Sequence, residues 1–209
     1  MNGIVETLQL ENTGMLQTFN QRPNVQFFEV TQVHSNIILT ISESSTAAEF
    51  KLHKADGMAI LFDHFHRALP CLAVKTADCL GVLAIGKVGI VLLHAGWRGL
   101  QSQILTQPLI HSIQPYRFHL TAHIQAQNYE VGAEFNDYFS HPNSLKCQDK
   151  KYFFSQKEEA HQQILNNWPK AQITSSQLNT FQDERLHSYR RQRATGSNYH
   201  LFTPQHVRN

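Results

Sequence analysis

Two apolar runs of equal length, separated by a short break that contains glycine, dominate the hydrophobic pattern of this chain. They cover residues 80–85 and 88–93, with Gly86 and Lys87 between them. Glycine at such a break supplies the positive φ that a tight turn between right-twisted strands needs, so the pattern predicts a β-hairpin. Both runs are apolar or glycine at every position. Strands of this kind are covered on both faces, so we expect a sheet that is sandwiched between other layers.

Shorter apolar runs predict further strands at 25–30, 37–41, 58–61, 69–74 and 171–175. One helix is predicted to start after Gly96 and to end or kink at Pro108. A second follows the capping box formed by Ser155 and Glu158, and a short helix is expected within residues 129–139. Strands and helices mix without strict alternation, which favours an α+β fold over a doubly wound sheet.

Composition bounds the domain count and the class of partner. No repeat or linker divides the 209 residues, residues 1–24 are only weakly patterned, and the hydrophobic content is 41%, so we expect one domain over 1–209. The net charge of +2, with basic residues scattered except at 190–193, predicts no nucleic-acid or membrane partner. We expect a monomer.

Cysteine usage and the absence of targeting patterns bear on location. The chain has three cysteines, an odd number, which argues against a disulfide framework and for a reducing compartment. No segment has the order of a signal peptide, and no apolar run approaches the roughly 18 residues of a membrane-spanning helix. The expected location is therefore the cytoplasm.

The open end of the predicted hairpin carries the strongest candidate chemistry. Cys79 precedes the first apolar run and His94 follows the second. If the turn has two residues, Ile85 faces Val88 and Cys79 faces His94, with Cβ atoms about 4.5–5.5 Å apart. A looser turn that includes Gly89 would shift the register by two and make the pair diagonal, still on one face.

A cysteine and a histidine at this distance have three interpretations. They could be two ligands of a metal site that needs a third, or a nucleophilic thiol with its base. They could also be a buried cysteine beside a core histidine, because cysteine is among the most buried residue types. The pair by itself leaves all three open.

Nearby residues have two interpretations each. Asp78 would point to the opposite face of a regular strand, which favours a structural hydrogen-bond acceptor over a general base. For Asp56, a role in a turn is favoured over one in orienting a ligand. For Trp97, a core position is favoured over stacking on a base. Arg190 and Arg191 fit phosphate binding and an exposed basic run equally well.

Six short motifs occur in a fixed order along the chain: Gln32-Val33-His34, Ala55-Asp56-Gly57, Thr76-Ala77-Asp78-Cys79-Leu80, His94-Ala95-Gly96-Trp97-Arg98-Gly99, Tyr129-Glu130-Val131-Gly132 and Ser188-Tyr189-Arg190-Arg191. Together they resemble the YfiH family, also called the laccase-domain or polyphenol-oxidase family. The resemblance runs from about residue 25 to residue 196.

The resemblance implies a fold and a metal site. The implied fold is a single-domain α/β/β/α layered sandwich of α+β type with mixed sheets, related in architecture to cysteine hydrolases. The implied metal ligands are His34, Cys79 and His94. Two imidazoles and a thiolate suit zinc, and three protein ligands leave the fourth tetrahedral position open, as catalytic sites require. Copper is a second possibility, implied by the polyphenol-oxidase description.

The resemblance also implies an activity, namely phosphorolysis of adenosine, inosine or methylthioadenosine and deamination of adenosine. One three-ligand site lacks the paired copper centres that oxygen reduction by a laccase needs, which favours the nucleoside chemistry. Arg98, just past His94 at a predicted helix start, is the candidate for holding phosphate. The expected catalytic residues are thus Cys79, His94 and Arg98, with a purine nucleoside and phosphate as small-molecule partners.

Three alternatives to this activity stay open: a metal-free cysteine–histidine hydrolase, a copper-dependent phenol oxidase and a degenerate metal-binding protein. The chain departs from the family pattern in several places. The family's N-terminal motifs are not recognisable, so we expect a domain shortened at that end. Ser35 replaces a glycine, residues 122–130 lack the family's cysteines, and Asn179 stands where cysteine is common. The three expected ligands are untouched.

Overall fold

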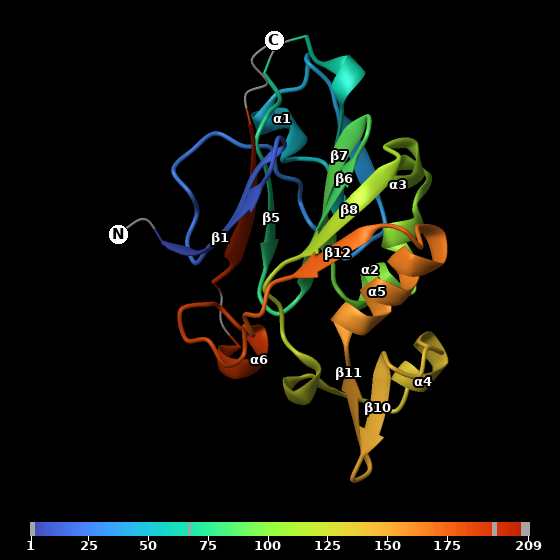
Figure 1. The fold of residues 1–209 in the computed structure, drawn as a ribbon. Coiled ribbons are helices and arrows are strands. Elements are labelled where there is room, and N and C mark those ends of the chain that lie inside the picture. The colour runs from blue at the N-terminus through green and yellow to red at the C-terminus, as the bar shows by residue number, and fades with distance from the viewer. Residues whose placement is uncertain (1–2, 67, 194–195, 206–209) are drawn as a thin grey trace.

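Two β-sheets stacked face to face form the body of the protein. The structure, a computed structural model, describes residues 3–66, 68–193 and 196–205. The larger sheet has the strand order β12-β8-β6-β7-β4-β3 (Figure 1). Its strands are β3 (Ile38–Ile41), β4 (Gly57–Leu61), β6 (Leu80–Gly86), β7 (Gly89–Ala95), β8 (Pro115–Leu120) and β12 (Gln172–Ser175). The two outermost pairs are parallel and the inner pairs antiparallel, so the sheet is mixed, as expected.

The smaller sheet has the order β1-β2-β13-β5. Its strands are β1 (Ile4–Leu10), β2 (Gly14–Phe19), β5 (Leu72–Thr76) and β13 (Asn198–Pro204). The β1–β2 hairpin lies in the segment whose weak pattern predicted no element. Strand β1 is an edge strand that buries only Leu10 fully, so its sequence lacks the apolar alternation of a half-buried strand.

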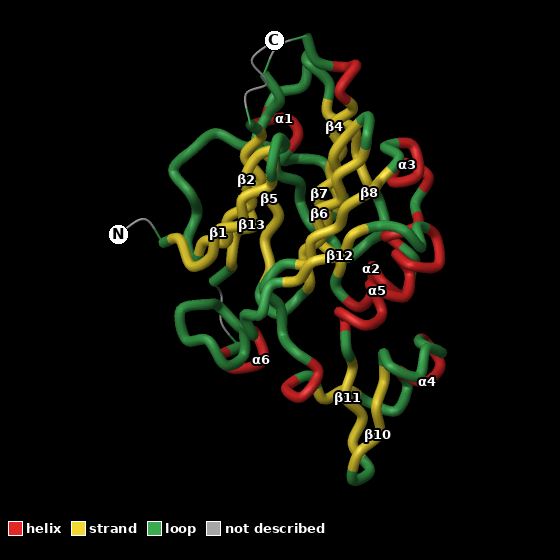
Figure 2. The backbone as a smooth tube through the Cα atoms, viewed as in Figure 1, coloured by secondary structure: helices red, strands yellow, loops and turns green. Residues whose placement is uncertain are grey.

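A third sheet forms an arm that extends from the body. It has the order β10-β11-β9, with β9 (Glu130–Val131), β10 (Leu145–Gln148) and β11 (Lys151–Phe154). Figure 2 shows the β10–β11 strands reaching away from the two large sheets. The short helix predicted within 129–139 is only partly right, because residues 130–131 pair with β11 and the helix starts at Phe135.

In the part of the chain that the structure describes, six α-helices accompany the sheets: α1 (Ala47–Phe50), α2 (Trp97–Gln101), α3 (Pro108–Ser112), α4 (Phe135–Tyr138), α5 (Gln156–Asn167) and α6 (Tyr189–Gln192). Helices α2, α3 and α5 lie on the outer side of the larger sheet (Figure 1). Helix α5 starts as predicted, because the Ser155 hydroxyl accepts a hydrogen bond from the Glu158 amide. The prediction that Pro108 ends a helix is wrong. Pro108 starts α3, a position where its missing amide hydrogen has no cost.

The alternating side chains of β6 reach two separate cores. Val82 and Ala84 pack under the helices, whereas Leu83 and Ile85 pack between the two sheets. Every residue of β6 and β7 is buried, which confirms the prediction of strands covered on both faces.

The segment 25–30 does not form the predicted strand. Phe28 makes one isolated bridge to Leu72, and Phe27 packs with Phe19 and Leu201 of the smaller sheet. The apolar residues of this segment therefore cover a sheet instead of joining one.

The register of the β6–β7 hairpin differs from the directly opposed pairing. Ile85 pairs with Ile90 and Gly81 with His94, so the turn is looser and Cys79 is diagonal to His94. Neither Gly86 nor Gly89 has the positive φ expected of the two-residue turn, and both are closely packed. A Cβ on Gly86 would overlap the Ile113 carbonyl, and one on Gly89 would lie 2.5 Å from the Ile60 carbonyl oxygen. These glycines serve the approach of neighbouring backbone and do not form a two-residue turn.

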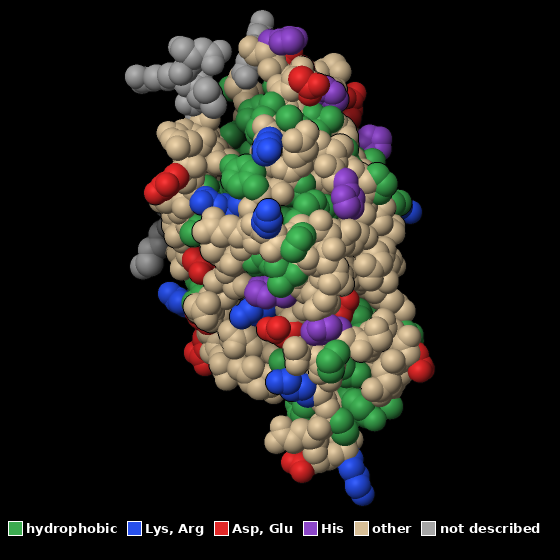
Figure 3. All heavy atoms as spheres, turned by 45° about the vertical axis from the view of Figure 1, so that its right-hand side comes forward, with side chains coloured by type: hydrophobic (Ala, Val, Ile, Leu, Met, Phe, Trp, Pro, Cys, Tyr) green, Lys and Arg blue, Asp and Glu red, His purple; other side chains and the backbone are tan. Residues whose placement is uncertain are grey.

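The surface carries charges of both signs. On the face shown in Figure 3, basic and acidic side chains are interspersed with hydrophobic and uncharged groups, in keeping with the net charge of +2. Of the helices in the described ranges, none has the length and apolar character needed to cross a bilayer.

Candidate metal centre

The structure brings His34, Cys79 and His94 together at one end of the two sheets. The possible ligand atoms of the three side chains all lie within 4.8 Å of one another. His94 belongs to β7, Cys79 directly precedes β6, and His34 lies in the loop before β3. His94 is buried, Cys79 is half-buried and His34 is exposed, so the group opens toward solvent on one side. The cysteine and the two histidines that the resemblance implied as ligands are neighbours in space.

Gly96 makes room for the thiol of Cys79. A Cβ on Gly96 would lie 2.9 Å from the Cys79 Sγ and 3.5 Å from the His34 Cδ2. Real Cβ atoms do not approach that closely, so any side chain here would displace the sulfur. The glycine that follows His94-Ala95 is therefore part of the site.

Asp56 orients two of the three candidate ligands. Its carboxylate is fully buried and accepts hydrogen bonds from the His94 Nδ1 at 2.8 Å and the His34 amide at 3.0 Å. It also accepts bonds from the amides of Val33 and Ser35. The expectation that Asp56 serves only a turn is wrong. Because Nδ1 of His94 donates to a carboxylate, Nε2 is left as the ligand atom, the usual arrangement at metal-bound histidines.

The loop that carries His34 is held to β5 by one side chain. The amide group of Gln32 donates to the Lys75 carbonyl at 2.7 Å, and its oxygen accepts from the Lys75 amide at 2.8 Å. His34 itself has a φ of 61°, a left-handed conformation that costs free energy outside glycine. The bonds from Gln32 and Asp56 hold the loop in that conformation.

The charges of the group stabilise a thiolate. Burial raises the pKa of Cys79, but hydrogen bonds from His34 and His94 and the positive charge nearby outweigh it and lower that pKa to about 6. Burial likewise lowers the pKa of His94, but the hydrogen bonds to Asp56 and Cys79 raise it to about 9. A deprotonated sulfur is the form that both metal binding and nucleophilic attack require.

Asp78 is a structural acceptor, in agreement with its predicted role. Its carboxylate accepts bonds from the Thr180 hydroxyl and the Arg190 amide, both at 2.7 Å. The assumption of a regular strand at this position is wrong, because Asp78 has a φ of 90° and β6 begins only at Leu80.

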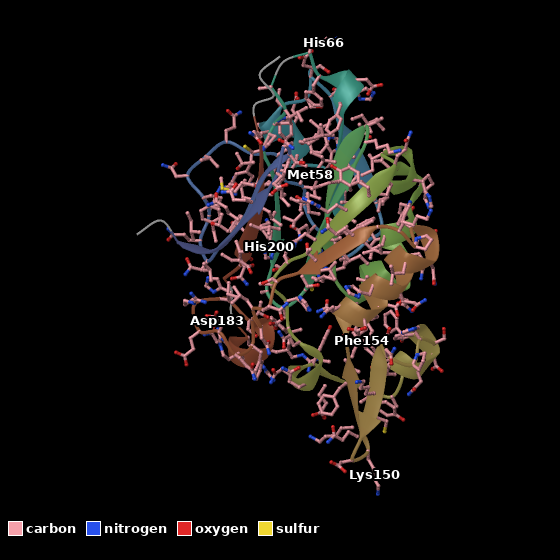
Figure 4. All side chains as sticks on the ribbon, viewed as in Figure 1. Met58, His66, Lys150, Phe154, Asp183 and His200 are labelled. Carbon is pink, nitrogen blue, oxygen red and sulfur yellow. The ribbon has the colours of Figure 1, made fainter. Side chains whose placement is uncertain are left out.

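A pocket of about 660 Å³ opens beside the three candidate ligands. Its wall includes Arg98, Tyr129, Tyr189 and Arg190 in addition to the three candidate ligands. A second pocket, of about 640 Å³, includes His66 and lies away from this site, at the end of the molecule where Figure 4 labels that residue.

Two ambiguities of the sequence are settled by contacts around this pocket. The half-buried Trp97 ring packs against Phe135 and Tyr138 at the margin of the core, with centroids 5.1 and 5.7 Å away, and it also lines the pocket. The Arg191 guanidinium donates to four backbone carbonyls and is structural, whereas Arg190 lines the pocket.

The family model described as "Multi-copper polyphenol oxidoreductase laccase" matches residues 8–203 of the chain. The chain belongs to this laccase family. Two curated relatives have the printed name purine nucleoside phosphorylase. The one from Aquifex aeolicus is 31% identical over 125 residues, which cover 54% of this chain and 60% of that protein. The one from Shigella flexneri, named YfiH, is 29% identical over 134 residues, 59% of this chain and 55% of that protein. The laccase-family chain thus spans less than two thirds of the length of both relatives.

Solved structures confirm the expected fold of this laccase-family protein. The Bacillus licheniformis hypothetical protein YfiH has a TM-score of 0.74 at 20% identity, covering 86% of this chain and 74% of that chain. A Neisseria meningitidis protein has a TM-score of 0.75 at 20% identity, covering 97% of this chain and 99% of that chain. At this level of identity the likeness concerns the fold alone.

Sequence reasoning gave no role to Gly96, Tyr129 or Tyr189, although all three belong to the site or its pocket. Each lies inside one of the motifs that carry the resemblance. Their position inside these motifs is therefore the sequence feature that could have identified them as site residues of this laccase-family protein. Their contacts were not deducible, because they depend on elements distant in the chain.

Proposed function

We propose that this protein is a metal-dependent purine nucleoside enzyme, with phosphorolysis as its main reaction and deamination of adenosine as a second one. The observation that carries the proposal is the convergence of His34, Cys79 and His94 within 4.8 Å on the wall of a pocket that also holds Arg98. The printed names of the Aquifex and Shigella relatives support the substrate class.

The donor set fits a divalent metal of the zinc type. Two imidazole nitrogens and a thiol are good zinc ligands, and Asp56 holds His94 in the tautomer that leaves Nε2 as donor. Copper would also accept these ligands. When bound, such an ion supplies a Lewis acid at the pocket wall and favours the ionised form of water or of Cys79.

The protein's own side chains would position the reactants. In phosphorolysis, a phosphate oxygen forms a bond to C1′ of the ribose while the C1′–N9 bond breaks. The purine leaves with the bonding electron pair and gains a proton. Arg98 would hold the phosphate through charge-assisted hydrogen bonds. Tyr189 is 61% exposed on the pocket rim, and among the described side chains no ring stacks on it, so it can take the purine base.

The test is a product assay with adenosine and phosphate. Purified, zinc-loaded protein should convert adenosine to adenine and ribose 1-phosphate, and in phosphate-free buffer to inosine and ammonia. Cys79→Ala should abolish both conversions while circular dichroism shows an unchanged fold. Product formation that is equal in Cys79→Ala and wild type, or absent from both, would reject the proposal.

A metal-free thiol hydrolase is the second candidate, favoured by one specific observation. The Cys79 thiol lies within 4.8 Å of the His94 ring nitrogen, and Asp56 orients that ring through a 2.8 Å hydrogen bond. This arrangement of nucleophile, base and orienting carboxylate is that of cysteine hydrolases, with Asp56 and not Asp78 as the orienting group. Iodoacetamide labelling of Cys79 separates the candidates. A resident metal makes labelling faster after chelation, whereas the hydrolase predicts equal rates.

Copper-dependent phenol oxidation is supported by the family description. Within the described ranges, one group of three histidine, cysteine or acidic residues has metal-binding geometry. A laccase needs several copper ions for the four-electron reduction of oxygen, so this donor set favours the nucleoside chemistry.

A further inference from the structure

Among the described residues, two arginines on the pocket wall have no acidic partner. The guanidinium of Arg98 lies over the Trp97 ring at 4.3 Å, and that of Arg190 lies over the Tyr129 ring at 5.1 Å. In the described part of the chain, neither guanidinium donates a hydrogen bond or forms an ion pair. Aromatic rings hold both groups in place, so their N–H donors are directed to whatever enters the pocket.

Tyr129 adds an uncharged donor to the same wall. It is 9% exposed, and its ring packs edge-on against Phe154 with the centroids 5.9 Å apart. Its hydroxyl has no hydrogen-bond partner among the residues that the structure describes, and it is not among the fully buried unpaired atoms. Burial raises the pKa of the Tyr129 phenol, so it stays protonated and can donate.

Tyr129 lines the same pocket as Cys79, Arg98 and Arg190. Because Arg190 covers the ring, Tyr129 is not free to stack a base on that face. What it offers to a ligand is therefore the O–H group.

The remaining charged groups on this wall are already engaged. Asp78 accepts bonds from the Thr180 hydroxyl and from the backbone amide of Arg190, so it anchors the residue that carries the guanidinium. Lys75 lies 3.7 Å from the buried carboxylate of Glu29. Outside the candidate ligands His34, Cys79 and His94, the positive charge available to a ligand is thus that of Arg98 and Arg190.

We propose that Arg98, Arg190 and Tyr129 form a subsite for inorganic phosphate next to the candidate metal centre. Guanidinium groups match the oxygens of phosphate in geometry and charge, and the phenol supplies a further donor. The choice of phosphate rests on the proposed phosphorolysis. Arg190 and Tyr129 are new binding residues, while Arg191, which is bonded to four carbonyls, has no part in the subsite.

Calorimetric titration of inorganic phosphate into the zinc-loaded full chain, without nucleoside, tests the subsite directly. Arg190→Gln should weaken phosphate binding roughly tenfold, the effect of losing one charge-assisted contact. Tyr129→Phe should weaken it by about threefold to tenfold, because it removes one neutral donor. The matched control is Arg185→Gln, since Arg185 is paired with Asp183 outside the pocket. That variant should bind phosphate like the wild type.

Steady-state kinetics separate binding from a general structural defect. In both pocket variants, the Michaelis constant for phosphate should rise while that for adenosine stays near the wild-type value. Equal phosphate affinity in Arg190→Gln, Tyr129→Phe and Arg185→Gln would overturn the subsite, as would a wild type that binds no phosphate at millimolar concentration. Should phosphorolysis be absent while Arg190→Gln still weakens phosphate binding, the proposed function fails and the subsite stands.

Discussion

Gly96 packs directly against the thiol of Cys79, at a place where a single added carbon would lie 2.9 Å from the sulfur. The contact joins the start of β6 to the end of β7 and fixes where the sulfur sits relative to His34 and His94. The geometry of the candidate metal centre therefore depends on a residue that offers no ligand atom.

Gly96→Ala should weaken metal binding without unfolding the protein. The added methyl group displaces the Cys79 sulfur by several tenths of an ångström, enough to spoil tetrahedral geometry around zinc. We expect at least a tenfold loss of zinc affinity, measured by competition with a chromophoric chelator. Gly132→Ala is the control, because its Cβ would meet only the flexible side chain of Glu134. Equal zinc affinity in the two variants would show that Gly96 does not shape the site.

Asp56→Asn should lower both metal affinity and stability. The variant loses the charged acceptor of His94 and weakens the bonds to the loop that carries His34. We expect zinc affinity to fall by about 10-fold to 100-fold, and the free energy of unfolding to fall by about 2 kcal/mol. Chelator competition and urea unfolding measure the two effects. Asp63→Asn, at a side chain that is 83% exposed, should change neither quantity.

The thiolate of Cys79 should be visible in the metal-free protein at unusually low pH. Its folded pKa of about 6 lies below the ordinary 9.0, so absorbance at 240 nm from this thiolate should rise with a midpoint near pH 6. Subtraction of the Cys79→Ala signal isolates it. His94→Gln removes a stabilising cation and should move the midpoint upward. A wild-type midpoint near 9 would contradict the charge distribution described for this site.

The same two groups predict opposite pH effects on the stability of the metal-free protein. His94 has its pKa raised from 6.5 to about 9, so its contribution is complete below 6.5 and is lost as the pH rises through 9. Cys79 has its pKa lowered from 9.0 to about 6, so its contribution is complete above 9 and is lost as the pH falls through 6. Thermal unfolding should be followed from pH 5 to pH 10. The melting temperature of the wild type should exceed that of Cys79→Ala by the most between about pH 6 and pH 9, where Cys79 and His94 are both charged in the folded protein.

Tyr189→Ala should raise the Michaelis constant for nucleoside if this ring stacks the purine. Loss of one aromatic contact is worth about 1 kcal/mol, or roughly a fivefold effect. The Michaelis constant for phosphate should change little, which distinguishes Tyr189 from its neighbour Arg190. Tyr116→Ala is a suitable control, because Tyr116 is also exposed but lines the other pocket. An unchanged constant for nucleoside in Tyr189→Ala would place the base elsewhere.

Local sequence signals were reliable where the interactions that they report are themselves local. The Ser155–Glu158 cap and the buried faces of β6 and β7 follow from spacing within a few residues. The proximity of Cys79 and His94 could also be predicted, because the two residues flank one hairpin. The resemblance to a known family supplied His34, which no spacing rule connects to the other two.

The donor types, the central hairpin and the mixed α+β class could be predicted from the residues alone, because residue chemistry and hydrophobic period are properties of short segments. The hairpin register emerged only in the folded protein, where Gly86 and Gly89 lie against backbone from other elements. The tertiary structure also decided that Asp56 orients His94, and that Arg190 faces the pocket while Arg191 is used internally. These outcomes rest on contacts between distant segments, whose energies are set when the sheets and loops pack together.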